Sequence, residues 1–179
     1  MASSAHYIQG NISKFFQKTI FLVVGASTNK TKFGNKILRC YIAHQKNVIP
    51  INMKEESIES IPCVPNITQY VQLIKDNTTN TTNITNNNNI GISICTPPKI
   101  TLSILKEGVS LGLTDYLCQP GTLDDACMQY INEIMLSTTT NSTTNTNNAN
   151  TSNNTKYNII TGCVLQELQC IDILNEDEH

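Results

Sequence analysis

A short apolar run near the start of the chain constrains the fold most strongly, because small residues end it and an amphipathic stretch follows. Residues 20–24 read Ile-Phe-Leu-Val-Val, residues 25–27 read Gly-Ala-Ser, and Phe33 and Gly34 open the amphipathic stretch. This order predicts a buried strand, a tight loop and the start of a helix. The first N–H groups of a helix lack intrahelical partners and lie at its positive end, so the junction favours a phosphate or pyrophosphate ligand.

The rest of the chain alternates apolar runs with stretches of helical spacing. We expect strands at residues 20–24, 48–51, 90–95, 114–118 and 157–161, and a short extended piece at residues 58–65. Four helices are expected between the strands, at residues 34–45, at 67–74, from Pro97-Pro98 to residues 108–112, and after residues 122–125. This alternation predicts an α/β fold, a single Rossmann-like doubly wound domain of about five parallel strands flanked by helices on both faces.

The helix ends and inner faces also follow from local patterns. Asn66 is expected to cap the second helix, the two prolines fit the first turn of the third, and residues 122–125 read as a capping box for the fourth. The residues expected to face inward are Ile37, Leu38, Tyr41 and Ile42, then Ile67, Tyr70, Val71 and Ile74, then Ile100, Ile104 and Leu105, and finally Tyr130, Ile131, Ile134 and Met135.

Composition divides the chain into a domain and its additions. Residues 77–89 and 137–155 consist almost entirely of Asn, Thr and Ser, too little apolar surface to offset the entropy of ordering, so we interpret them as surface insertions. We expect an N-terminal extension at residues 1–18, a binding domain at residues 19–170 and an acidic tail at residues 171–179.

The charges and cysteines limit the classes of partner. Net charge is −2, and eight of the twelve basic residues precede Glu55, which favours a local anion site over a nucleic-acid surface. No apolar run is long enough to cross a bilayer. We therefore expect neither a nucleic-acid nor a membrane partner.

The cysteines and the N-terminal residues indicate the cellular compartment in which the protein resides. The seven cysteines include no Cys-x-x-Cys pair and lie mostly in apolar segments, which is typical of buried thiols in a reducing compartment. The three histidines lie far apart, so we expect no metal site. No secretory signal is visible, and residues 1–18 contain Ser and Lys but no acid or arginine. We expect a cytoplasmic protein, with the mitochondrial matrix as the alternative.

Several blocks in order resemble the small stand-alone CoA-binding proteins with a Rossmann-like fold, which are related to the nucleotide-binding domain of succinyl-CoA synthetase alpha subunits. Thr-Pro-Pro after the third strand and Gln-Pro-Gly after the fourth carry the resemblance most specifically. The blocks span residues 19–168 and comprise residues 23–27 with 32–34, 48–52, 93–101, 119–121 and 162–163.

The resemblance implies a site for the adenosine and pyrophosphate of CoA or acyl-CoA. Glycine and small residues would let the backbone approach the pyrophosphate, lysines would supply phosphate charge, an amide would read the ribose, and the prolines would form a wall beside the adenine. The implied residues are Gly25, Ala26, Ser27, Lys30, Lys32, Phe33, Gly34, Lys36, Asn52, Thr96, Pro97, Pro98 and Gln119.

Some of these residues have an alternative structural role. Phe33 would equally serve to staple the helix start to the core, the prolines to begin their helix, and Gln119 to close its own turn. The chain also departs from the family where Met53 replaces a proline and Ser60 stands near a common glycine. We expect the loop between the second strand and the second helix to be reshaped.

The function predicted is binding of CoA or acyl-CoA without catalysis, because no paired acids or activated nucleophile are evident. One alternative is an enzyme or redox protein in which Cys95, Cys118 or Cys163 exchanges with the thiol or thioester of CoA. A second alternative is an NAD-binding or nucleotide-sensing scaffold, and a third is a protein-interaction scaffold. NAD sites carry an acidic residue after the second strand, and Asn52 at that position argues against NAD. A homodimer or another protein partner stays open.

Overall fold

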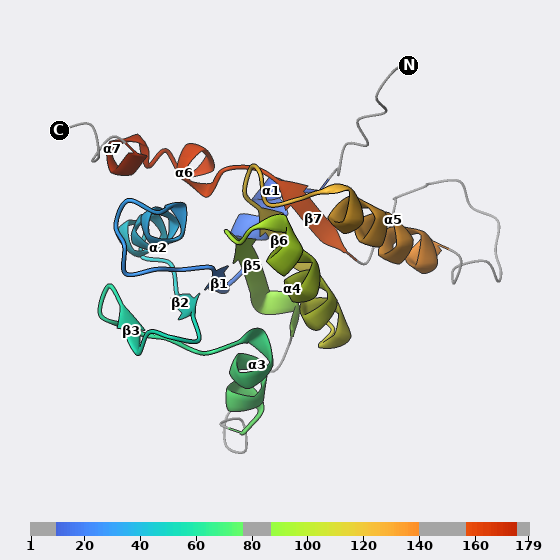
Figure 1. Ribbon diagram of the computed structural model, residues 1–179, viewed down its shortest axis with the longest axis horizontal. Helices are drawn as coiled ribbons and strands as arrows, with labels where there is room; N and C mark the ends of the chain where they lie inside the picture. The colour runs from blue at the N-terminus through green and yellow to red at the C-terminus, as the bar shows by residue number, and fades with distance from the viewer. Residues whose placement is uncertain (1–9, 77–86, 140–156, 175–179) are drawn as a thin grey trace.

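Five parallel strands form the main sheet of the computed structural model, which describes residues 10–76, 87–139 and 157–174 (Figure 1). They pair in the order β2-β1-β5-β6-β7. Every central strand is buried along its length, as parallel strands covered on both faces must be. The prediction of a single Rossmann-like α/β domain is confirmed. The strands are β1 (Ile20–Val24), β2 (Val48–Ile51), β5 (Ile90–Ile94), β6 (Asp115–Cys118) and β7 (Asn158–Thr161).

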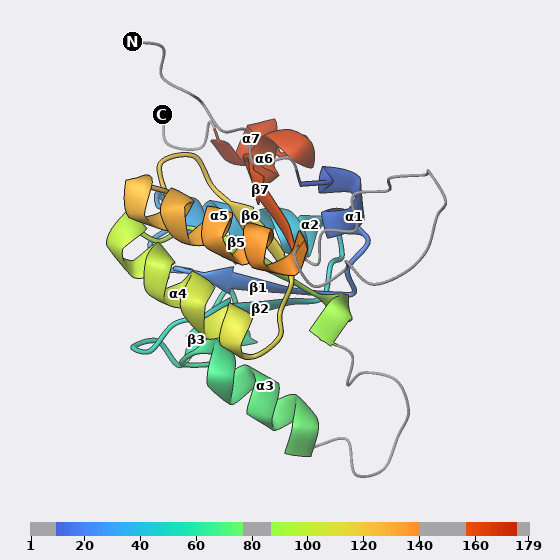
Figure 2. The same cartoon turned by 90° about the vertical axis from the view of Figure 1, so that its right-hand side faces the viewer.

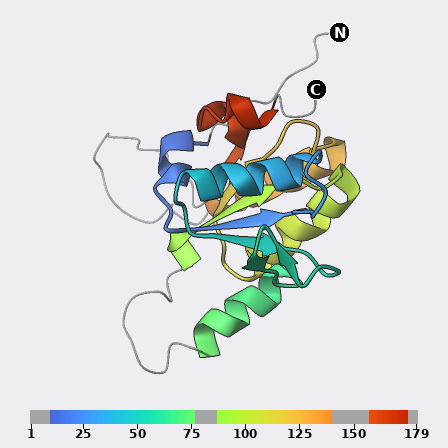
Figure 3. The ribbon, with the colours of Figure 1, turned by 90° about the vertical axis from the view of Figure 1, so that its left-hand side faces the viewer.

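Helices cover both faces of this sheet, and each face has its own apolar core. On one face lie α3 (Ile67–Asp76), α4 (Pro98–Ser110) and α5 (Asp125–Thr139), with α4 and α5 side by side (Figure 2). The other face is covered by α1 (Ile12–Phe16), α2 (Phe33–Ala43), α6 (Val164–Glu167) and α7 (Ile171–Leu174). Figure 3 shows α2 and α3 on opposite sides of the strands.

The strand order fixes where a ligand can enter. From β1 the chain passes to β2 on one side, and β5 then pairs with the other side of β1. In open α/β sheets the crevice for a ligand lies at such a reversal, outside the carboxyl ends of the two strands. Gly25 follows β1 and Cys95 follows β5 at this point. A Cβ placed on Gly25 would touch the Cys95 backbone and Thr96, so the two loops are in close contact.

The expected inner faces are mostly correct, with two exceptions. Ile42 is 38% exposed and Ile100 is 50% exposed. In α2 the buried face contains Ile37 and also Cys40, which lies three residues further along the helix. Ile42 therefore lies outside this buried face. In α4 the buried line runs through residues 101, 105 and 108, which turns Ile100 toward solvent.

One helix cap was predicted correctly and another was not. Asn66 accepts a hydrogen bond from the backbone N–H of Gln69 at 2.8 Å, as an N-cap does. The capping box at residues 122–125 is wrong, because Asp124 caps α5 by accepting from the N–H of Cys127 at 2.9 Å. Thr122 is engaged earlier, where its hydroxyl donates to the carbonyl of Gln119 at 2.7 Å.

Segments expected to be additions contribute to the domain where they are described. Helix α1 buries Phe15 completely against Phe21, with ring centroids 5.7 Å apart. Lys18 forms an ion pair with Asp115 at 2.7 Å. Residues 87–89 form a 3₁₀ turn and residues 137–139 continue α5. The remainder of the N-terminal extension, of both Asn/Thr tracts and of the acidic tail lies outside the described residues.

The cysteines differ from expectation at one pair. Cys40 on α2 and Cys170 after α6 form a disulfide across a sequence separation of 130 residues, so these two are not free thiols. Such a pairing depends on tertiary structure and leaves no local sequence signal. Cys118 and Cys127 are buried thiols, as predicted. Within the described part of the chain, no helix has the length and apolar character needed to span a membrane.

Candidate functional site

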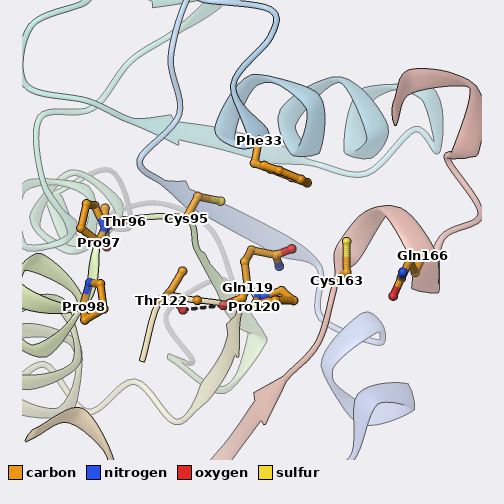
Figure 4. A pocket seen from close by; sticks show the side chains of 11 residues that line it. Phe33, Cys95, Thr96, Pro97, Pro98, Gln119, Pro120, Thr122, Cys163 and Gln166 are labelled. Carbon is orange, nitrogen blue, oxygen red and sulfur yellow. Dashed lines mark hydrogen bonds between the residues drawn. The ribbon is translucent and has the colours of Figure 1, made fainter. Parts of the chain in front are cut away.

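A cavity of about 550 Å³ opens at the carboxyl ends of β5, β6 and β7, beside the start of α2. Figure 4 shows Phe33 reaching over it from α2, with Gln119 beneath and Cys163 at the start of α6. This volume lies within the range of small-molecule sites. The lining residues are Phe33, Cys95, Thr96, Pro97, Pro98, Gln119, Pro120, Gly121, Thr122, Cys163 and Gln166.

Gln119 is held at the floor of this cavity by a tight turn. Its backbone N–H donates to the carbonyl of Ile94, and its own carbonyl accepts from the N–H of Thr122 at 3.1 Å. Pro120 and Gly121 occupy the middle of that turn, and Gly121 has a φ of +83°, the left-handed conformation that glycine adopts without strain. The Gln-Pro-Gly motif therefore exists to turn the chain and to fix Gln119 at the end of β6.

The side chain of Gln119 has one satisfied end and one free end. Its Oε1 accepts from the backbone N–H of Val164 at 3.2 Å, which ties β6 to the first residue of α6. Its Nε2 is buried and has no hydrogen-bond partner among the described residues, although the whole side chain is only 5% exposed. A buried donor without a partner costs about 1–3 kcal/mol, so an acceptor supplied by a ligand would be favoured here.

The loop between β1 and α2 is packed tightly against the first turn of the helix. Gly25 has a φ of +92°, and a Cβ on Gly34 would overlap the Gly25 carbonyl oxygen. Helix α2 begins at Phe33, and its N-cap residue Lys32 makes no side-chain cap hydrogen bond. No side-chain cap therefore covers its N-terminus, while the predicted phosphate contact there stays a prediction.

The three lysines proposed for phosphate charge lie in different surroundings. Lys30 and Lys32 are exposed on the loop and at the helix start. Lys36 is only 5% exposed and is packed within α2. None of the three lines the cavity. Their role in binding phosphate stays a prediction, and the two exposed ones are best placed for a phosphate bound outside the cavity.

Asn52 is occupied by contacts within the protein. Its Nδ2 donates to the carbonyl of Ala26 at 2.8 Å, and its Oδ1 accepts from the N–H groups of Lys54 and Glu55 at 2.7 and 3.1 Å. The amide thus joins the loop after β1 to the loop after β2. Asn52 fixes the position of Ala26, while its predicted ribose contact stays untested.

The region after Asn52 contains short paired strands, where the sequence predicts a short extended piece at residues 58–65. A small antiparallel pair forms between β3 (Ser57–Ile58) and β4 (Ile61–Pro62). Glu59 and Ser60 connect them with φ values of +49° and +64°, where glycine would be less strained. Glu59 also accepts a hydrogen bond from Asn35, which donates to the carbonyl of Ser27 as well.

The Thr-Pro-Pro motif begins a helix and also lines the cavity. Pro97 is the N-cap of α4 and Pro98 its first residue, so the prolines begin the helix. All three residues also line the cavity. The hydroxyls of Thr96 and Thr101 lie 2.9 Å apart, which holds the motif against the first turn of α4. Phe33 likewise faces the cavity while 58% exposed, which does not fit a buried staple.

The structure adds residues that the implied site did not contain. Pro120, Gly121 and Thr122 line the cavity beside Gln119, and Cys163 and Gln166 close its far side. Cys163 is the N-cap of α6. The Gly-Cys block after the fifth strand was the sequence signal that could have identified it.

Two of the thiols at the strand ends, Cys95 and Cys118, have raised pKa values. Burial raises the pKa of the Cys95 thiol to about 12, and the neighbouring Cys163 and Cys118 add to the shift. Burial also raises the pKa of Cys118 to about 12, with a further contribution from Cys127. A reactive cysteine needs the opposite shift, because the thiolate is the nucleophile.

Comparison with known proteins identifies solved structures with the same fold and a family model that matches this chain. The model of a CoA binding domain matches residues 19–148. A conserved hypothetical protein from Pyrococcus furiosus is 22% identical with a TM-score of 0.57, over 84% of this chain and 98% of its own. A hypothetical protein from Pyrococcus horikoshii is 16% identical with a TM-score of 0.59, over 95% and 98%. These likenesses show the fold. No curated protein matches the chain.

Proposed function

This chain belongs to the CoA binding domain family, and from that premise we propose that it binds CoA or acyl-CoA at the crevice between β1 and β5 without catalysing a reaction alone. The phosphates lie at the β1–α2 junction, and the pantetheine arm enters the cavity at the ends of β5, β6 and β7. Each half of the ligand thus meets a part of the site that suits its chemistry.

The unpartnered Nε2 of Gln119 is the observation that carries this proposal. The pantetheine arm contains amide carbonyls, and an acyl-CoA adds a thioester carbonyl, so either supplies the acceptor that the buried donor lacks. The remaining wall is formed by Phe33, prolines and thiols, which suits a narrow, mainly apolar arm. A ligand without a carbonyl in this position would leave the donor unsatisfied.

The geometry of the loop after β1 supports the proposed position of the ligand phosphates. Gly25 and Gly34 bring the loop and the helix start together, and α2 opens without a side-chain cap. Lys30 and Lys32 are exposed next to it and add positive charge. A helix N-terminus flanked by lysines stabilises a pyrophosphate and an additional 3′-phosphate.

The absence of catalysis is proposed from the cavity lining. Its lining residues include no Asp, Glu, His, Lys or Arg, so no acid–base pair faces the arm within the described part of the chain. The ionisable groups in the lining are two thiols, and burial raises the pKa of Cys95. Binding is the activity that such a lining supports.

The test is to identify the ligand that the protein carries and the ligand that stabilises it. Purified protein is denatured, and the released small molecules are analysed by mass spectrometry. Thermal unfolding is then measured with added CoA, acetyl-CoA and NAD. At a free ligand concentration of 100 times Kd the native state gains about 2.7 kcal/mol, a clear rise in melting temperature. No CoA in the extract together with no shift from CoA or acetyl-CoA would refute the proposal.

A further inference from the structure

A second group of chemically active side chains lies away from the cavity, at the C-terminal end of α2. Cys40 lies on α2, His44 is the C-cap residue of that helix one turn further on, and Cys170 meets them from the segment after α6. The sulfurs and the imidazole nitrogen all lie within 4.8 Å of one another. Both cysteines are buried while His44 is exposed, so the group has an apolar interior and an opening to solvent.

We propose that reduction of the Cys40–Cys170 disulfide creates a Zn²⁺ site formed by the two thiolates and His44. The oxidised and reduced states then use the same three side chains for two purposes, a covalent cross-link and a metal site. This proposal does not depend on CoA binding, because none of the three residues lines the cavity.

The distances from His44 to the two sulfurs suit a tetrahedral zinc centre, whereas the sulfurs, bonded to each other in the disulfide, must separate to about 3.8 Å after reduction. With Zn–S bonds near 2.3 Å and Zn–N bonds near 2.0 Å, a ligand nitrogen and a ligand sulfur lie about 3.6 Å apart. His44 Nδ1 lies 3.6 Å from the sulfur of Cys170 and 4.0 Å from that of Cys40. The imidazole is therefore already within a few tenths of an ångström of where a zinc ligand would be.

The cost of using Nδ1 as a ligand is small. Nδ1 lies 2.9 Å from the carbonyl oxygen of Cys40, a hydrogen bond that metal binding would remove. That carbonyl keeps a partner, because it also accepts from the backbone N–H of His44 at 3.1 Å. The proton moves to Nε2, which an exposed imidazole can present to water. The site also lies at the C-terminal end of α2, where the helix dipole favours a cation.

The chemistry balances with a dithiol as reductant. The dithiol reduces the disulfide to two thiols and becomes a disulfide itself. Zn²⁺ then displaces one proton from each thiol and accepts the lone pair of Nδ1. Two thiolates and one imidazole leave a fourth position for water, an arrangement that Cys₂His zinc sites use.

Cobalt provides the test, because Co²⁺ bound by thiolates in a tetrahedral site gives charge-transfer and d–d absorption bands. The reduced full-length protein is titrated with Co²⁺ and then with Zn²⁺, beside the oxidised protein. We expect one Co²⁺ per reduced chain with thiolate bands, displacement by Zn²⁺, and no thiolate bands from the disulfide form. Reduced wild-type protein without these bands, or an oxidised protein with the same bands, would overturn the proposal.

Variants assign the ligands. Cys170→Ser should abolish the thiolate bands, and Cys63→Ser, at a partly buried thiol elsewhere, should leave them unchanged. His44→Ala alters an exposed side chain, so the fold is retained, and Co²⁺ affinity should fall about tenfold or more. Circular dichroism checks the fold of each variant. Unchanged affinity in His44→Ala, or equal losses in the two serine variants, would contradict the assignment.

Discussion

Gln119→Glu tests the role of the buried donor by changing essentially one atom. The substitution keeps an oxygen to accept from the N–H of Val164 and replaces Nε2 by a second oxygen. Opposite a ligand carbonyl, a donor–acceptor pair becomes two facing acceptors. Losing the hydrogen bond costs about 1 kcal/mol, and leaving the ligand oxygen without a donor adds about 1 kcal/mol more. We expect Kd for CoA to rise about thirtyfold at neutral to basic pH.

The same substitution predicts a pH signature that the wild-type amide lacks. The position is nine-tenths buried, so burial should raise the pKa of the introduced carboxyl above its ordinary value of about 4.3. Below the raised pKa the protonated carboxyl offers an O–H donor and affinity recovers. Above it the donor is lost. The stability of the variant changes with pH in the same direction as its affinity. A raised folded-state pKa makes the free energy of unfolding fall as pH rises from about 4.3 to the raised value.

Calorimetric titration of CoA between about pH 5 and pH 8.5 measures this, with each variant compared to wild type at the same pH. Gln169→Glu is the matched control, because it adds the same charge at an exposed position outside the cavity lining. We expect the control to change Kd little. Wild-type affinity in Gln119→Glu at basic pH would refute the donor role, and equal weakening in both variants would assign the effect to charge alone.

Three further substitutions or modifications test other parts of the account. Gly34→Ala places a methyl group against the carbonyl of Gly25 in the loop after β1. It should lower the free energy of unfolding by about 1–3 kcal/mol and weaken CoA binding. An unchanged free energy of unfolding together with unchanged CoA affinity would contradict the close packing. Asp115→Asn leaves the buried charge of Lys18 without its counter-ion and should cost about 3–5 kcal/mol in urea unfolding, and a loss below about 1 kcal/mol would show that the pair is dispensable. Native Cys95 and Cys118, with pKa values near 12, should resist iodoacetamide at about pH 8 and react after unfolding, whereas rapid native labelling would revive a thiol-dependent enzyme.

Much of the fold was predictable because apolar residues predominate in the strands, and β1 is apolar throughout. In a parallel sheet both faces are covered, so the strand signal does not depend on alternation, and residues 20–24 and 90–94 are buried throughout. The strand ends were predictable for a related reason. Turn residues such as Gly25 and the Gln-Pro-Gly motif interrupt the apolar runs, and parallel strands bring those interruptions to one edge.

The features that the sequence could not reveal depend on tertiary contacts. The Cys40–Cys170 disulfide joins segments 130 residues apart, and nothing local marks either cysteine. The Asn52 amide, which the resemblance assigns to a ligand, also donates to the carbonyl of Ala26, a contact that no local pattern predicts. The free Nε2 of Gln119 is likewise visible only once α6 has taken up its Oε1.

The central claim is most directly tested by isothermal titration of the wild-type protein with CoA, beside dephospho-CoA and NAD at the same ionic strength. The account predicts saturable binding of CoA, weaker binding of dephospho-CoA because the exposed Lys30 and Lys32 lose the 3′-phosphate, and weaker binding of NAD because it has no pantetheine arm for Gln119. No heat with CoA, or NAD binding more tightly than CoA, would contradict it.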